Sequence, residues 1–363
     1  MSIQTDVVVI GAGPVALFQA FQLGLLGLRC ELVDAQPHAG GQCVALYPDK
    51  PIYDVPGVPR CTGRELTELL LQQAAPFLPT DPDTGQRPNV HLGHLVTQLQ
   101  RLDSPAPGAP RFAVHTDQGL SLRARAVVVA AGAGAFLPRA LPLPGLPSPS
   151  PLNLHHHLPP AGDAPAWAGA DLIVAGGGDE ALQTLLDLLD SPPAHRPSRL
   201  RLLHRRDQFQ AEAALELAVR EHLAAGHIEL LIGVPQGCTV EPGGRLTHIH
   251  LLGADAQPQV HRLDHLLVRL GLSPKLGPLS DWGLALDRKQ VAVDPATFES
   301  NLPGVYAVGD INTYAGKKRL LLCGFHEATL AAHGLASDLR PHDPQHLLYT
   351  TTSPLLHQRL GLV

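Results

Sequence analysis

Two glycine-rich turns, each directly after an apolar run, have the residue pattern of phosphate binding. The runs are residues 7–10 and 171–175, and both are expected to be buried strands followed by a helix. The residues that carry the pattern are Gly11, Gly13 and Pro14 in the first turn, and Gly176, Gly178 and Asp179 in the second. Glycine lets a backbone approach a pyrophosphate, and a helix N-terminus supplies unpaired N–H groups and a partial positive charge. Two such turns in one chain predict two dinucleotides held together, as when a flavin is reduced by a nicotinamide.

An acidic residue follows the first turn at the spacing of a ribose ligand. The expected strand at residues 30–33 ends at Asp34, 23 positions after Gly11. Dinucleotide-binding units place there the carboxylate that binds a ribose hydroxyl. A helix cap or a surface turn is the alternative interpretation of Asp34.

A basic sequence follows the second turn at the equivalent place. Residues 200–203 form an expected strand, and His204, Arg205 and Arg206 come next. An NAD site has an acid at such a strand end, whereas an NADP site has arginine for the 2′-phosphate. The pair therefore favours NADPH, with a basic surface turn as the alternative.

Composition limits the class of protein. The 363 residues carry a formal charge of −6, which argues against nucleic-acid binding. Charged or helix-breaking residues interrupt every apolar run, so no membrane span is expected, and the N-terminus has no signal-peptide pattern. The five cysteines have no C-x-x-C spacing, which is consistent with reduced thiols. We therefore expect a cytoplasmic protein.

The order of the elements predicts an α/β fold with two Rossmann-like, three-layer dinucleotide-binding domains. Prolines concentrated in residues 141–151 suggest a boundary, and residues 264–268 suggest a return to the first domain. We expect an FAD domain at 1–138 and 264–363, with a C-terminal tail at 341–363. An NADPH domain at 139–263 would be inserted into it.

Three consecutive histidines, His155, His156 and His157, could suggest a metal site. Adjacent side chains in regular structure cannot all face one ion, and no second ligand cluster lies nearby in sequence. A solvated hinge is the interpretation we favour.

Several further motifs carry a family resemblance. They are Gly40-Gly41-Gln42, residues 45–55, residues 132–139, residues 276–284, Val308-Gly309-Asp310, residues 313–317 and residues 324–328. With these motifs the chain resembles the ferredoxin/flavodoxin–NADP reductases of the thioredoxin-reductase-like type, through about Pro341. The resemblance implies a homodimer with FAD in the first domain, NADPH in the second and no redox-active disulfide.

The resemblance also assigns residues to the flavin site. It implies that Tyr47 stacks on one face of the flavin ring and that Asp310 contacts FAD near the ribityl–phosphate region. Asp310 follows an apolar run at 305–308, where an ordinary helix cap is the alternative. The other residues placed beside FAD are Gln42, Asp54, Phe136 and Thr351.

The chain departs from the family pattern at three places. Glu180 stands where relatives usually have a small hydroxyl residue, and a carboxylate about 4 Å from a phosphate would cost roughly 1–4 kcal/mol. The alternative is that Glu180 faces outward, where the helix dipole would favour it. Gln210 stands where relatives often have arginine. The histidine of the family's C-terminal tail has no counterpart in residues 349–353, with His346 and His357 displaced on either side.

These features favour an FAD enzyme that transfers electrons between NADPH and ferredoxin or flavodoxin, by hydride transfer to flavin N5. One alternative is a thioredoxin-type disulfide reductase, which would need a partner thiol for Cys43. Another is a flavin-binding redox or sensor protein with a decayed nicotinamide site, which Glu180 and Gln210 would suggest. Residues 317–319 are either a basic patch for an acidic carrier or a solvated loop.

Overall fold

The computed structural model describes residues 2–103, 106, 108–156, 167–342 and 349–362. The chain forms two compact units. Unit 1 comprises Met1–Phe136 and Pro274–Val363, and unit 2 comprises Leu137–Ser273. Strands β9 (Ala135–Pro138) and β17 (Leu272–Lys275) lie at the two boundaries and pair with each other.

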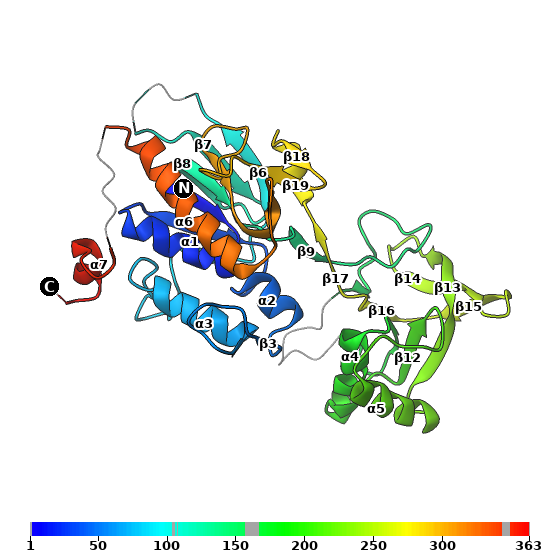
Figure 1. Cartoon of the computed structure of the whole chain (residues 1–363). Coiled ribbons are helices and arrows are strands. Elements are labelled where there is room, and N and C mark those ends of the chain that lie inside the picture. Colours follow the sequence, from blue (N-terminus) through cyan, green and yellow to red (C-terminus); the bar gives the residue numbers. More distant parts are fainter. Residues whose placement is uncertain (1, 104–105, 107, 157–166, 343–348, 363) are drawn as a thin grey trace. The chain divides into compact units, whose positions relative to one another are not determined.

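Unit 1 is built on a seven-stranded, mainly parallel sheet with the order β5-β2-β1-β8-β7-β6, and with β20 paired to the second half of β8 (Figure 1). The strands are β1 (Ile3–Ile10), β2 (Cys30–Asp34), β5 (Val90–Leu92), β6 (Val96–Arg101), β7 (Phe112–Thr116), β8 (Ser121–Val129) and β20 (Val305–Ala307). The central strands β1 and β8 end in runs of buried valine and isoleucine, as expected of parallel strands covered on both faces.

Helices cover one face of this sheet, and short strands and turns cover the other. The helices are α1 (Pro14–Leu25), α2 (Gly41–Leu46), α3 (Gly63–Ala74), α6 (Leu321–Leu339) and α7 (Pro354–Arg359). Helices α1 and α6 lie side by side (Figure 1). Between them, Phe18 packs on Phe325 with the ring centroids 5.1 Å apart. The short strands β3 (Pro51–Ile52) and β4 (Cys61–Thr62) pack on the helix side. The other small elements are η2 (Gly277–Asp281), β18 (Leu286–Asp287), β19 (Gln290–Ala292), η3 (Gly309–Ile311) and β21 (Asn312–Thr313).

Unit 2 has its own seven-stranded sheet, with the order β10-β16-β11-β12-β13-β14-β15. The strands are β10 (Leu154–His155), β11 (Asp171–Ala175), β12 (Arg199–His204), β13 (Glu229–Val240), β14 (Leu246–Gly253), β15 (Pro258–Arg262) and β16 (His265–Val268). The first five strands in this order are parallel, and β13 to β15 form an antiparallel meander. Helices α4 (Asp179–Asp190) and α5 (Ala213–Ala224) pack on one face. A short 3₁₀ turn, η1 (Pro193–His195), precedes β12. The α/β class with Rossmann-like units is thereby confirmed.

The second boundary differs from the expected one. Strand β16 pairs with β11 and β10 inside the sheet of unit 2, so the chain returns to unit 1 only at Pro274. All four residues of β16 are buried. A buried run of this kind is typical of a strand in the middle of a parallel sheet. Asp264 therefore precedes a strand of unit 2 and does not begin the return to unit 1.

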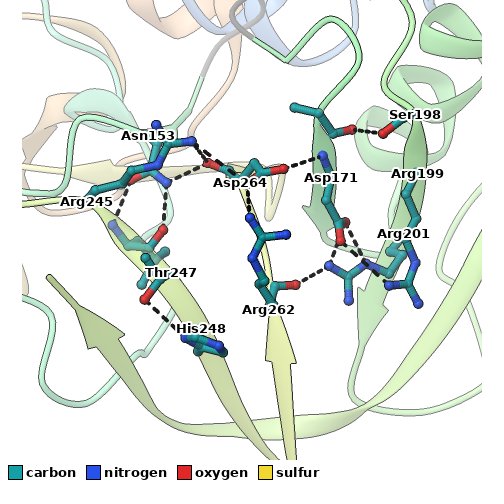
Figure 2. A network of polar contacts seen from close by, with 12 residues as sticks. Asn153, Asp171, Ser198, Arg199, Arg201, Arg245, Thr247, His248, Arg262 and Asp264 are labelled. Atoms are coloured by element: carbon teal, nitrogen blue, oxygen red, sulfur yellow. Dashed lines mark hydrogen bonds and ion pairs between the residues drawn. The ribbon is translucent and has the colours of Figure 1, made fainter.

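A polar network closes the amino ends of the unit 2 strands, as Figure 2 shows. The guanidinium of Arg201, only 1% exposed, donates to Asp171 Oδ1 through Nε (3.0 Å) and Nη2 (2.6 Å). Asp264 Oδ2 in turn accepts the Asp171 N–H at 3.0 Å. These contacts tie β11, β12 and the start of β16 together at the end of the sheet opposite the glycine turn, where they serve the fold.

His155, the first residue of the histidine triplet, does not lie in a solvated hinge. His155 lies in β10, its Nε2 is 3.0 Å from His265 Nδ1, and its ring packs edge-on against Trp167. Burial lowers the pKa of His155 below its ordinary value. His157 lies outside the described residues. Among the described residues no group of three or more histidine, cysteine or acidic side chains could hold a metal ion.

Candidate functional site

Unit 1 contains a cavity of about 220 Å³ at the carboxyl ends of β1, β2 and β8. Ligands of open α/β sheets bind at this end of the strands. Seven residues singled out from the sequence line it together: Gly11, Gly13, Pro14, Asp34, Gln42, Tyr47 and Asp310. They come from four separate segments of the chain, so the fold brings them to one place.

Two glycines at the first turn, Gly11 and Gly41, leave no room for a side chain. Gly11 has a φ of +121°, and a Cβ there would lie 2.4 Å from the carbonyl oxygen of Ala130. A Cβ at Gly41 would lie 2.9 Å from the Cα of Gly13. Helix α1 starts after Gly13 with Pro14 in its first turn and no side-chain cap. The remaining N–H groups of that turn are therefore available to an anion in the cavity.

Asp34 is held in place by the backbone. Its Oδ2 accepts the Ala12 N–H at 2.6 Å and its Oδ1 accepts the Gln36 N–H at 2.8 Å. Burial raises the pKa of the Asp34 carboxyl, and these two N–H donors oppose that rise. The carboxylate is thus fixed beside the glycine turn, as binding of a ribose hydroxyl requires.

The segment after β5 is a part of the cavity that sequence reasoning missed. Strand β5 runs parallel to β2, and the His94 N–H donates to the Asp34 carbonyl oxygen at 2.9 Å. His94, Leu95 and Val96 consequently line the cavity next to Asp34. Strand β5 has only three residues, so its pairing with β2 could not be predicted from its sequence.

Behind Asp310 lies a buried ion pair. The side chains of Lys317 and Glu327, 7% and 0% exposed, form an ion pair. Lys317 Nζ also donates to the Gly309 carbonyl oxygen at 2.9 Å, and Glu327 Oε2 accepts the Gly309 N–H at 2.7 Å. The ion pair thus binds both the carbonyl oxygen and the N–H of Gly309, the residue before Asp310. Burial raises the pKa of the Asp310 carboxyl, while the Lys317 charge opposes that rise.

Residues 317–319 were interpreted as either a basic carrier patch or a solvated loop, and for Lys317 this pairing contradicts both interpretations. Lys317 is turned inward and its charge is neutralised by Glu327, so only Lys318 and Arg319 are exposed. Charge in a sequence gives no information on which way a side chain faces.

Tyr47 ends helix α2 and lines the cavity. Its hydroxyl is 3.7 Å from Cys43 Sγ, and burial raises the pKa of the Tyr47 phenol. The hydroxyl contact orients the ring, which fits an aromatic that covers a flat ligand.

Of three other residues assigned by resemblance, two do not line the cavity, and the side chain of the third lies outside the described residues. Asp54 and Thr351 are exposed and do not line it. Phe136 lies in β9, and its side chain is outside the described residues. Of the tail histidines, His346 is also outside them and His357 lies in α7.

The second glycine turn lies at the carboxyl ends of β11, β12 and β16. A Cβ at Gly176 would lie 2.2 Å from the Arg269 carbonyl oxygen, and one at Gly177 would lie 2.5 Å from the His204 ring. Gly178 then caps helix α4 without any side-chain hydrogen bond. The structure therefore places His204 against the turn that contains Gly176 and Gly178, as the spacing predicts.

The charged residues around this turn divide into paired and unpaired groups. Asp179 Oδ1 accepts the Glu212 N–H at 2.7 Å, so this carboxylate tethers the start of α5. Glu180 Oε1 is 3.0 Å from Arg269 Nη1. Arg205 and Arg206 are exposed and form no ion pair with another described residue. Gln210 contacts the turn through its backbone, where its N–H donates to the Gly177 carbonyl oxygen at 2.7 Å.

All five cysteines lie in the described part of the chain, and all are free thiols. Burial raises the pKa of Cys43 and Cys61, which keeps both protonated. No described helix has the length and apolar character that a membrane span requires.

A two-nucleotide arrangement of this kind defines a class of flavin-dependent and nicotinamide-dependent oxidoreductases, and the sequence comparisons agree. Residues 5–331 match the family described as pyridine nucleotide-disulphide oxidoreductase. The chain belongs to this family.

The curated relatives narrow the family to one branch. The chain is 50% identical over 357 residues to a ferredoxin–NADP reductase of Acidovorax sp. (strain JS42), covering 98% of this chain and 95% of that protein. It is 49% identical to a ferredoxin–NADP reductase of Paracidovorax citrulli, covering 99% and 97%. The resemblance to ferredoxin–NADP reductases is confirmed.

The fold also agrees with that of solved structures. A thioredoxin reductase from Gloeobacter violaceus superposes with a TM-score of 0.53 over 96% of this chain and 98% of that chain, at 20% identity. At this identity the likeness concerns the fold alone.

Proposed function

We propose that this protein is an FAD enzyme that transfers electrons between NADPH and a ferredoxin or flavodoxin. The observation that carries the proposal is the presence of both dinucleotide turns in a chain half identical to ferredoxin–NADP reductases over nearly its full length. The proposal extends to a homodimer, which light scattering on the purified protein would test.

The residues of the unit 1 cavity fit FAD. Gly11, Gly13 and the uncapped start of α1 would take the pyrophosphate, and Asp34 would take a ribose hydroxyl. Tyr47 would cover the flavin ring, with Asp310 beside the ribityl chain. Bound there, FAD would supply an acceptor for the hydride of NADPH at N5 and a donor of single electrons to the carrier.

The residues of unit 2 fit NADPH. The N-terminus of α4 would take its pyrophosphate, with Gly176 and Gly178 keeping the approach open. Arg205 and Arg206 would bind the 2′-phosphate, since both guanidinium groups lack an ion-pair partner among the described residues. His204 Nδ1 lies 2.7 Å from the Arg206 carbonyl oxygen, which orders the loop that carries both arginines.

An anaerobic titration of the FAD-loaded protein tests the proposal. NADPH should bleach the flavin absorbance at low concentration, NADH should be much weaker, and ferredoxin or flavodoxin should then reoxidise the protein. A flavin that neither nucleotide reduces would refute the assignment of unit 2.

A disulfide reductase is a second candidate that the cysteines do not favour. Cys43 lines the cavity beside Tyr47, but its Sγ forms no disulfide and its pKa is raised. An exchange reaction needs an accessible thiolate. Variants C43S and C61S should therefore keep NADPH-dependent reduction of the carrier unchanged.

A further inference from the structure

We propose that Arg269 is a positioning residue of the nicotinamide half, which neutralises Glu180 and so allows a dinucleotide phosphate to bind at the start of α4. This inference rests on the proposed function, because it concerns how unit 2 holds NADPH.

Arg269 is built into the glycine turn. It directly follows β16, and its N–H donates to the Ala175 carbonyl oxygen at 2.8 Å. Its own carbonyl oxygen is the atom that a Cβ at Gly176 would meet. The side chain is 15% exposed, so its position is set by the surrounding protein.

The guanidinium has three partners, two of which, Glu180 and Thr184, lie in the first half of α4. Nη1 lies 3.0 Å from Glu180 Oε1 and donates to the His156 carbonyl oxygen at 3.1 Å. Nε donates to Thr184 Oγ1 at 3.2 Å, and the Thr184 hydroxyl donates to the Glu180 carbonyl oxygen at 2.7 Å. Arg269 therefore contacts the carboxylate of Glu180 directly and is linked to its carbonyl oxygen through the Thr184 hydroxyl.

The charge of Glu180 is the reason this arrangement bears on binding. At the N-terminus of a helix, a free carboxylate competes with an incoming phosphate for the same N–H groups and repels it. The Glu180 carboxylate and the Arg269 guanidinium together carry no net charge, and the ion pair holds the carboxylate toward Arg269. The neighbouring acid, Asp179, is also occupied, because it accepts the Glu212 N–H. Both acids that follow the glycine turn thus have partners within the protein.

The test measures the equilibrium affinity of the FAD-loaded protein for NADP⁺ by calorimetry, in the wild type and in R269M, E180Q and the double variant E180Q/R269M. R269M should weaken NADP⁺ binding about tenfold, because it leaves an uncompensated charge near the pyrophosphate. The double variant should bind within about threefold of the wild type, since the repelling charge is also gone.

Two controls locate the effect. R199M removes the same charge at the amino end of β12, where Arg199 pairs with Glu229, and should leave the NADP⁺ affinity unchanged. The ligand 2′-AMP carries the 2′-phosphate but no pyrophosphate, so R269M should bind it as the wild type does. A general loss of structure would lower both affinities.

The outcomes separate the inference from the proposed function. Unchanged NADP⁺ binding in R269M overturns the inference, and so does a double variant as weak as R269M, which would mean that Arg269 is needed for itself. NADP⁺ binding by E180Q/R269M but not by the wild type would show that Glu180 blocks the site despite Arg269. If none of the proteins binds NADP⁺, the proposed function fails and takes the inference with it.

Discussion

Replacing Lys317 with methionine should destabilise unit 1, because it leaves a buried carboxylate without its counter-ion. Glu327 is fully buried and Lys317 is 7% exposed on its side chain. Removing one partner of a buried ion pair costs about 3–5 kcal/mol. Three donors to Glu327 remain, from Gly309, Asn312 and Tyr314 at 2.7, 2.9 and 3.0 Å. We therefore expect the low end of that range, about 3 kcal/mol.

The assay is thermal unfolding of the FAD-loaded protein, followed by the flavin fluorescence that rises when FAD is released. For a domain of this size, 1 kcal/mol corresponds to about 2–4 °C, so K317M should lower the transition by about 6–12 °C. Flavin release reports on unit 1, which contains the cavity, and avoids treating both units as one transition.

Two variants make the prediction sharp. K318M removes the exposed neighbouring charge and should shift the transition by less than about 2 °C, as expected of a surface substitution. K317M/E327Q removes both charges, while the oxygen of the introduced amide can still accept from Gly309 and Asn312, and it should recover more than half of the loss. A shift for K317M no larger than that for K318M, or a double variant no more stable than K317M, would refute the reasoning.

Three other predictions follow from the sites. G11A should abolish FAD binding or folding of unit 1, because its Cβ would lie 2.4 Å from the Ala130 oxygen at a φ of +121°; flavin content of the purified protein measures this. R205A/R206A should weaken NADPH binding about 10–100-fold and leave NADH binding nearly unchanged, since only the 2′-phosphate contacts are lost. Burial raises the pKa of Asp310, so in the apoprotein this carboxyl contributes stability that is full below pH 3.8 and is lost as the pH rises through the raised pKa. D310N should therefore raise the apoprotein melting temperature at pH 7, flatten its dependence on pH, and weaken FAD binding about 10–100-fold.

The parts of the site that could be predicted are those specified by contiguous residues. The turn at Gly11 and the acid at Asp34 are separated by one helix and one strand, so their spacing alone places them at the same edge of the sheet. The same holds for Gly176 and the strand that ends at His204. In each case the local pattern and the expected parallel pairing predict that the two segments lie at the same edge of the sheet. The structure has this parallel pairing, of β1 with β2 and of β11 with β12.

The parts that could not be predicted depend on contacts between distant segments. Lys317 and Glu327 are only ten positions apart, but the direction of the Lys317 side chain is decided by the carbonyl of Gly309 and by the burial of α6. The place of β16 in unit 2 follows from pairing with β11, more than 90 positions earlier. The charge of Lys317 and the hydrophobicity of β16 show which kinds of contact these residues can form. They do not show which distant residues they contact.

Glu180 shows why a departure from a family pattern is weak support for loss of function. Considered alone, a carboxylate at a phosphate-binding turn predicts repulsion, and a decayed nicotinamide site would follow. Arg269 lies 89 positions later in the chain, and its Nη1 is 3.0 Å from the Glu180 carboxylate. The charge that would repel a phosphate is therefore compensated by an ion pair. In a site that had lost its function, we would not expect the Glu180 charge to be compensated. We would also not expect Arg205 and Arg206 to stay exposed and without an ion-pair partner among the described residues. The arrangement is better explained by a turn that still binds an anion, with the neutralising charge supplied from the neighbouring strand.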